Sequence, residues 1–174
     1  MTHLLDYQPL NLYTNYQEAA EKTPTVPIIF DESLPAFPAL GLETTYGESH
    51  QEILKRAYQL AALGVKKGDK IIIYKSPKFD TYLLAVAASY LAAVPVMVSY
   101  HLPFETIEVF VDRLEDPYIL FDDVTAEKVQ AVRNSSANKK LSVASLLEAD
   151  ATEVPQDELT KDEIAYMTHT SGTT

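Results

Sequence analysis

Short, continuous apolar runs that alternate with helical patterns constrain this chain most. Residues 70–74 have an uninterrupted apolar centre, Ile71-Ile72-Ile73. Such strands are typical of parallel sheets, in which helices cover both faces and neither face needs polar residues. Residues 79–93 follow as a helix that is apolar almost all round, and 94–98 as the next strand. The alternation predicts an α/β fold with a mostly parallel, doubly wound sheet and helices on both faces.

The remaining elements follow from periodicity and from capping residues. One helix is expected to begin at Ser49 as its N-cap and to stop at Gly64, where a left-handed residue is favourable. Thr125 is expected to cap another helix. Further helices are predicted at 12–22, 103–114 and 125–133, and further strands at 26–30, 118–121, 141–143 and 164–168.

Charge and composition argue against several classes of function. The formal net charge is -11, which disfavours binding to nucleic acid or to anionic membranes. The chain contains no cysteine, which excludes disulfides and thiolate catalysis. This absence is compatible with a reducing cytoplasm, and a cytoplasmic location is our expectation. We see no signal peptide at the start, and the longest apolar stretch, 82–98, is broken by Ser89 and Pro95. No membrane span is expected.

The segment after the last predicted strand is the candidate binding site. It reads His169-Thr170-Ser171-Gly172-Thr173-Thr174. Glycine lets the backbone approach an anion, and small hydroxyl side chains add donors without bulk, so the segment suits a phosphate-binding loop. It lacks the lysine of a Walker A loop. Strings of serine, threonine and glycine are also typical of flexible loops, so the residues alone leave both interpretations open.

Four segments in order resemble the adenylate-forming (AMP-binding) superfamily, which includes acyl-CoA synthetases, luciferases and peptide-synthetase adenylation domains. Thr170-Ser171-Gly172-Thr173-Thr174 is similar to the first half of the family's phosphate-loop signature. Three earlier segments are similar to the family's earlier motifs, namely Thr45-Tyr46-Gly47-Glu48, 61–71 and 85–98. The chain departs from the family in having Ala92-Ala93 where glycine is common and Ser99-Tyr100 where proline is common. These departures favour an acyl-CoA synthetase or fatty-acid–CoA ligase over a peptide-synthetase domain.

The resemblance implies an N-terminal part of a large AMP-binding domain within a longer ligase. On this interpretation 1–45 is an irregular lead-in, 46–148 an α/β core, 149–162 an acidic linker, and 163–174 a strand and the start of the phosphate loop. The parent would use ATP, Mg²⁺ and coenzyme A to convert a carboxylic acid to an acyl-adenylate and then to an acyl-CoA. Thr170, Ser171, Gly172, Thr173 and Thr174 would hold the β- and γ-phosphates. The family's catalytic and metal-binding residues lie further along, so we expect the 174 residues alone to be inactive.

Other polar residues admit a functional and a structural interpretation. His169 could contact a phosphate or the acyl carboxylate, and His101 follows a strand at the expected ligand edge; either could instead be a packing residue. Asp122-Asp123 and the cluster Asp112, Glu115 and Asp116 could bind a metal, although such residues are more typical of strand and helix ends. A non-catalytic α/β binding or interaction module remains the alternative function.

Overall fold

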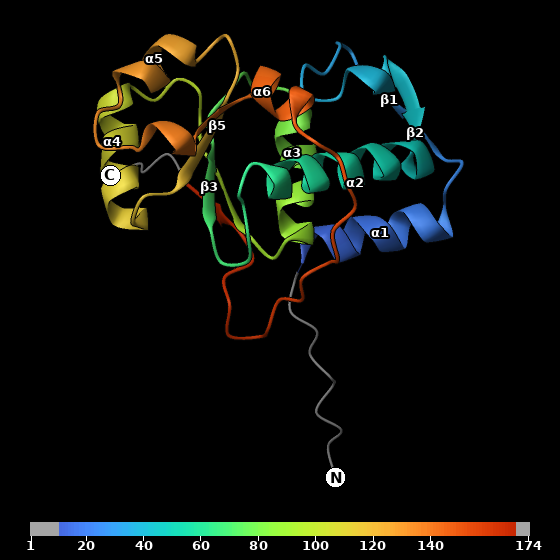
Figure 1. Cartoon of the computed structure of the whole chain (residues 1–174). Coiled ribbons are helices and arrows are strands. Elements are labelled where there is room, and N and C mark those ends of the chain that lie inside the picture. Colours follow the sequence, from blue (N-terminus) through green and yellow to red (C-terminus); the bar gives the residue numbers. More distant parts are fainter. Residues whose placement is uncertain (1–10, 170–174) are drawn as a thin grey trace.

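The computed structural model describes residues 11–169, which form a five-stranded sheet between two layers of helices (Figure 1). The order of strands across the sheet is β6-β5-β3-β4-β7, and every neighbouring pair is parallel. The strands are β3 (Lys70–Ile73), β4 (Val94–Met97), β5 (Tyr118–Phe121), β6 (Lys140–Ser142) and β7 (Met167–Thr168). The predicted α/β fold with a parallel sheet is confirmed.

The central strand β3 explains why the apolar run is continuous. Ile71 and Ile73 contact one cluster of buried side chains, and Ile72, between them, contacts the other. Successive side chains of a strand point to opposite faces, so a strand covered on both sides needs an apolar residue at every position. All three isoleucines are fully buried.

The two helical layers differ in size. The helices over the face that Ile71 and Ile73 contact are α1 (Leu12–Lys22), α2 (Tyr46–Ala62), α3 (Asp80–Tyr90) and α6 (Val143–Glu148). The other face is covered by α4 (Phe104–Leu114) and α5 (Ala126–Ala131). Figure 1 shows α4 and α5 on one side of β3 and β5, with α1, α2 and α3 on the other. Among the helices of residues 11–169, none combines the length and apolar character of a membrane-spanning segment.

A small antiparallel hairpin lies outside the main sheet. Its strands are β1 (Pro27–Ile29) and β2 (Glu43–Thr45), and a 3₁₀ turn at Pro38–Leu40 lies between them. The first strand was predicted, whereas β2 and the short helix α6 were not. Three-residue and six-residue elements contain too few side chains to show a periodic pattern.

Between α6 and β7, the chain runs from 149 to 166 without helix or strand, yet it is held to the α1–α3 layer. The Tyr90 hydroxyl donates to the Val154 carbonyl at 2.7 Å, and the Asp157 amide donates to the Tyr90 carbonyl at 3.1 Å. Lys67 Nζ donates to the Glu158 carbonyl at 2.7 Å. These contacts fix the path by which the chain reaches β7.

One of the predicted caps was wrong. Helix α2 begins at Tyr46 with Thr45 as its N-cap, whereas Ser49 lies inside the first turns and its hydroxyl donates to the Thr45 carbonyl at 2.7 Å. Serine can bond back to the preceding turn in this way, so a capping residue type does not by itself mark a helix start. Thr125 is the N-cap residue of α5, as predicted, but its hydroxyl donates to the Tyr74 carbonyl at 2.6 Å and makes no capping bond to the helix. Gly64 ends α2 with a φ of 95°, as predicted.

The start of α2 is a capping box made by the motif Thr45-Tyr46-Gly47-Glu48. The Thr45 hydroxyl accepts from the Glu48 amide at 3.2 Å, and the Glu48 carboxylate accepts from the Thr45 amide at 3.1 Å. Both donors would otherwise lack a partner inside the helix.

Replacing Thr45 by alanine should therefore lower the free energy of unfolding by about 1 kcal/mol, because the Glu48 amide loses its acceptor. Thr45→Ser retains the oxygen and should stay close to the starting value. Urea unfolding of the two variants measures the difference; equal destabilisation by both would contradict the capping role.

Tyrosines of α1 form the outer edge of the core. The Tyr13 hydroxyl lies 3.1 Å from His50 Nε2, and the Tyr16 hydroxyl lies 2.6 Å from Ser49 Oγ. Burial is the main cause that raises the pKa of Tyr13 to about 12, with further contributions from Tyr58 and Glu21. Burial likewise raises the pKa of Tyr16 to about 12, although the hydrogen bond with Ser49 opposes it.

These shifts predict alkaline instability. Phenols of the unfolded chain ionise near pH 10, whereas those of Tyr13 and Tyr16 hold their protons to about pH 12, so unfolding between these values releases protons. Their contribution is complete below pH 10, and the free energy of unfolding should fall as pH rises toward 12. Urea unfolding at pH 9 and 11 measures this fall, which should be smaller in Tyr16→Phe; an equal fall in both proteins would refute the assignment.

Candidate functional site at the carboxyl edge of the sheet

The segments that follow β3, β4, β5 and β7 meet at one edge, because parallel strands all end on the same side. In open α/β sheets, ligands bind at this edge between two neighbouring strands whose following helices lie on opposite faces of the sheet. Here those strands are β3 and β5. The chain leaves β3 through α3 toward β4, and it leaves β5 through α5 toward β6 on the other side of the sheet.

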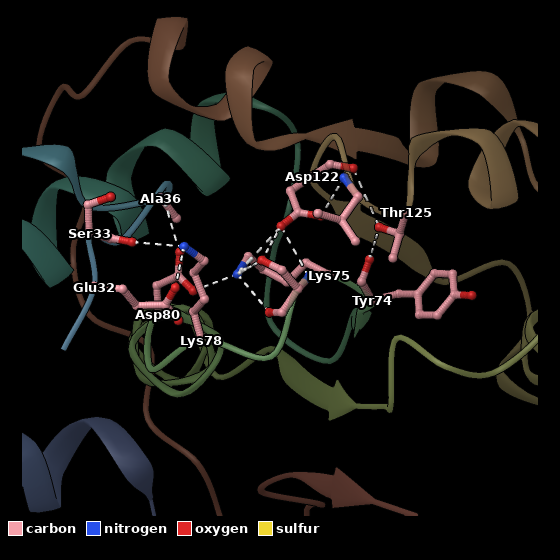
Figure 2. Close-up of polar contacts among 11 residues, drawn as sticks. Glu32, Ser33, Ala36, Tyr74, Lys75, Lys78, Asp80, Asp122 and Thr125 are labelled. Carbon is pink, nitrogen blue, oxygen red and sulfur yellow. Dashed lines mark hydrogen bonds and ion pairs between the residues drawn. The ribbon is translucent and has the colours of Figure 1, made fainter. Parts of the chain in front are cut away.

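The space between the ends of β3 and β5 is filled by a buried ion pair (Figure 2). Lys75 Nζ lies 2.5 Å from Asp80 Oδ1 and 3.9 Å from Asp122 Oδ2. The side chains of Lys75 and Asp80 are both completely buried. Because a charge without a partner is very costly in such an environment, the three groups must remain together.

Hydrogen bonds connect this ion pair to three loops. Asp80 Oδ2 accepts from the Ala36 amide at 3.0 Å, which holds the loop before the 3₁₀ turn. Asp122 Oδ2 accepts from the Ser76 amide at 3.1 Å and from the Ser76 hydroxyl at 2.5 Å. Asp122 Oδ1 accepts from the Val124 amide at 3.2 Å. Both carboxylate oxygens of Asp122 therefore accept hydrogen bonds from neighbouring residues of the chain, which agrees with a structural role at the end of a strand.

The other acidic candidates also form structural contacts. Asp112 accepts from Asn134 Nδ2 at 2.7 Å, and the Asp116 carboxylate accepts from the Ser136 hydroxyl at 3.3 Å. Within residues 11–169, no three histidine or acidic side chains gather in a way that could hold a metal ion.

Breaking the ion pair should be much more harmful than replacing it. Lys75→Met leaves two buried carboxylates without their cation and should lower the free energy of unfolding by about 3–5 kcal/mol. Lys75→Met combined with Asp80→Asn removes one of those charges and keeps an acceptor for the Ala36 amide, so much of the loss should be recovered. Urea unfolding of the single and double variants measures this coupling; simple additivity would contradict it.

A pocket of about 410 Å³ opens beside the ion pair, above the ends of β3 and β4. Its lining residues come from the start of α3 and from the segments that follow these two strands: Lys75, Pro77, Lys78, Thr81, Val98, Ser99, Tyr100 and His101. The Lys78 ammonium is paired with Glu32 at 2.8 Å and donates to the Ser33 carbonyl at 3.2 Å. Both lysines of the pocket therefore already have acidic partners.

His169 connects the pocket to the predicted phosphate loop. Its Nε2 accepts a hydrogen bond from the Ser99 amide at 2.9 Å. A nitrogen that accepts from an amide carries no proton, so the ring is in the tautomer with its proton on Nδ1. This bond fixes the residue immediately before the loop against the end of β4.

The remaining predicted residues fall into two groups. His101 lies at the same edge as His169 and lines the pocket, as expected for a residue that follows β4. The predicted phosphate-binding residues lie outside the described part of the chain, so their binding role stays a prediction. They are Thr170, Ser171, Gly172, Thr173 and Thr174. Lys75 and Asp80 were missed, although a lysine directly after a buried apolar strand is an unusual placement that could have indicated them.

Comparison with known proteins gives the family. Residues 16–174 match the family of AMP-binding enzymes. The chain is 33% identical over 110 residues to 3-amino-2-hydroxy-4-methoxybenzoate diazotase of Streptomyces cremeus, covering 63% of this chain and 20% of that protein. It is 26% identical over 145 residues to 4-coumarate–CoA ligase 1 of Petroselinum crispum, covering 75% of this chain and 26% of that protein.

Solved structures agree at the level of the fold. A long-chain-fatty-acid–CoA ligase of Archaeoglobus fulgidus superposes with a TM-score of 0.77 at 18% identity, covering 98% of this chain and 36% of the ligase. The N-terminal subdomain of NpsA of Klebsiella oxytoca, in complex with 3-hydroxybenzoyl-AMSN, gives 0.73 at 21% identity, covering 99% of this chain and 41% of that one. The chain spans between a fifth and about a quarter of the length of the curated relatives it matches. With the parallel sheet and the family match over 16–174, the chain belongs to the AMP-binding enzyme family.

Proposed function

We propose that this chain is part of an adenylate-forming ligase that activates a carboxylic acid with ATP. An oxygen of the carboxylate forms a bond to the α-phosphorus as the bond from that phosphorus to the bridging oxygen breaks. The electron pair of the broken bond leaves with pyrophosphate, and the other product is the acyl-adenylate. The family match over residues 16–174 is the observation that carries this proposal.

The carboxyl edge supports the proposal because it suits a phosphate loop. Strand β7 pairs with β4 and leads directly into His169, whose contact with the Ser99 amide fixes where the loop begins. Backbone amides and hydroxyls of Thr170–Thr174 would then stabilise the charge that develops on pyrophosphate as it leaves. Their role is electrostatic, and none of these hydroxyls is a nucleophile.

We further propose that Mg²⁺ accompanies ATP and that coenzyme A receives the acyl group. The thiol sulfur would form a bond to the acyl carbon as the bond from that carbon to the phosphate oxygen breaks, so that AMP leaves and the thiol proton is released. Several curated relatives are CoA ligases, among them the 2-succinylbenzoate–CoA ligase of Geobacillus, which is 26% identical over 134 residues. Mg²⁺ would neutralise charge on the phosphates. The described residues contain no cluster of acidic ligands for it, so its protein ligands would lie elsewhere in the enzyme.

The relatives favour an aromatic acid over a long-chain fatty acid as the substrate. Their names refer to a substituted benzoate, to succinylbenzoate and to coumarate. Because a relative at 33% identity is a diazotase, a second candidate is the modification of an aminobenzoate at its amino group. A substrate lacking an amino group separates the two, since a ligase would still activate benzoate.

Carboxylate-dependent exchange of labelled pyrophosphate into ATP tests the proposal. The longer enzyme that carries this chain should catalyse the exchange with an aromatic acid, whereas the 174 residues alone should not. In that enzyme Ser171→Ala should lower the exchange rate by roughly 10-fold or more, because one loop donor is lost.

Ser136→Ala, which changes an exposed serine far along the chain from the loop, should leave the rate within twofold. Exchange by the 174 residues alone would overturn the expectation that they are inactive. Binding of a ligand by the longer enzyme without any exchange would favour the alternative, a non-catalytic module.

A further inference from the structure

We propose that Lys128, which lies on α5, is a positioning residue for the phosphate loop. Its ammonium holds the β4–α4 turn (residues 99–102), and this turn in turn holds His169, the residue just before the loop. The inference rests on the proposed function. Lys128 acts through these contacts and does not itself touch ATP.

Lys128 directs its charge at two backbone carbonyls. Its side chain is half-buried, and Nζ donates to the Tyr100 carbonyl at 2.7 Å and to the Leu102 carbonyl at 3.4 Å. Nζ also lies over the Tyr74 ring, 5.8 Å from its centre. None of the ion pairs within residues 11–169 includes this ammonium. A half-buried charge is costly unless its donors are satisfied, so the two carbonyls keep Lys128 in this position.

A second donor reaches the same turn from the end of β3. The Tyr74 hydroxyl donates to the Leu102 carbonyl, and Tyr74 is fully buried. The Tyr74 carbonyl accepts from the Thr125 hydroxyl at 2.6 Å, which connects the segment after β3 to the residue before α5 (Figure 2). Tyr74 and Lys128 therefore form one support, and the Leu102 carbonyl accepts from both, as its two lone pairs allow.

The β4–α4 turn needs this support because it lacks regular structure. Within it, the Leu102 amide donates to the Ser99 carbonyl at 3.1 Å, and the His101 amide donates to the Ser99 hydroxyl at 3.3 Å. These bonds shape the turn but do not attach it to the rest of the chain. The donors of Lys128 and Tyr74 do attach it, to α5 and to the end of β3.

The same turn holds the start of the phosphate loop. The ladder between β4 and β7 ends with the pair Met97 and Thr168, and beyond it the Ser99 amide donates to His169 Nε2 at 2.9 Å. A shift of the turn displaces this amide, and His169 moves with it. The donors of a phosphate loop act only within hydrogen-bond distance of the charge that they stabilise, so such a displacement weakens their hold on the phosphates.

Kinetics of the longer enzyme in the pyrophosphate exchange assay test the assignment, with benzoate or 4-coumarate as the acid, whichever exchanges faster. Lys128→Met removes the ammonium and keeps an unbranched side chain. We expect KM for ATP to rise by roughly 10-fold, because charge-assisted hydrogen bonds are lost, while KM for the acid changes by less than about twofold. Lys128→Arg keeps charged donors and should recover most of the loss.

Lys140→Met is the matched control. Lys140 Nζ also donates to a backbone carbonyl, that of Val132 at the end of α5, at 2.6 Å. Lys140 begins β6 and therefore lies at the opposite edge of the sheet. The control removes the same kind of bond from the same helix, and KM for ATP should change by less than about twofold. A loss of stability alone lowers the amount of active enzyme and leaves KM unchanged.

A double variant shows whether Lys128 acts through His169. His169→Leu removes the acceptor for the Ser99 amide, whereas His169→Gln supplies an amide oxygen and should be the milder change. In the His169→Leu background, Lys128→Met should raise KM for ATP by less than about a further twofold, since the connection is already broken. An undiminished effect in that background would mean that Lys128 acts by another route and would overturn the inference.

Failures of the two proposals can be distinguished. An enzyme without carboxylate-dependent exchange contradicts the ligase function, and this inference falls with it. An active enzyme whose folded Lys128→Met variant keeps its KM for ATP overturns only the role of Lys128. If that variant does not fold, Lys128→Gln, which keeps a neutral donor, takes its place, and an unchanged KM for ATP would count equally against the role.

Discussion

The carboxyl edge of this molecule depends on the buried ion pair between Lys75 and Asp80. Moving two charges out of water is costly, and their attraction repays that cost only when other hydrogen bonds satisfy the remaining donors and acceptors. Asp80 has such a bond from the Ala36 amide, and Asp122 has two from Ser76. Ala36, Ser76 and Asp122 belong to three different loops, so the arrangement requires these loops to adopt one geometry together.

This requirement explains why the pocket lies where it does. The ion pair fills the space between β3 and β5, which is where an open α/β sheet would ordinarily admit a ligand. The remaining open space is above β3 and β4, on the side of the sheet where β7 leads into the predicted loop.

The sequence predicted the architecture well because the sheet is covered on both faces. Because β3 is buried along its whole length, it appears in the sequence as an apolar run that can be recognised without the tertiary structure. The bounds of α1 and β5 were predicted to the residue. The start of α2 was placed too late because Ser49 and Thr45 are both good capping residues. Only the reciprocal contact with Glu48 distinguishes them.

The sequence predicted the residues of the candidate site less well than it predicted the fold. Lys75 and Asp80 are five residues apart and resemble ordinary surface charges on either side of a turn. Their burial depends on the loop around Ala36, which is 44 residues away in sequence and meets them only in the folded chain. The phosphate loop was predicted by resemblance to a family, and the match over residues 16–174 supports the family but not the role of each loop residue.

A crystal structure of the longer enzyme with a stable analogue of benzoyl-adenylate would test the central claim most directly. We expect the phosphate of the analogue to lie against the loop that follows His169, at the carboxyl ends of β4 and β7. We also expect the Lys75–Asp80 pair to be retained. An adenylate whose phosphate is bound away from the ends of β4 and β7 would contradict the proposed function.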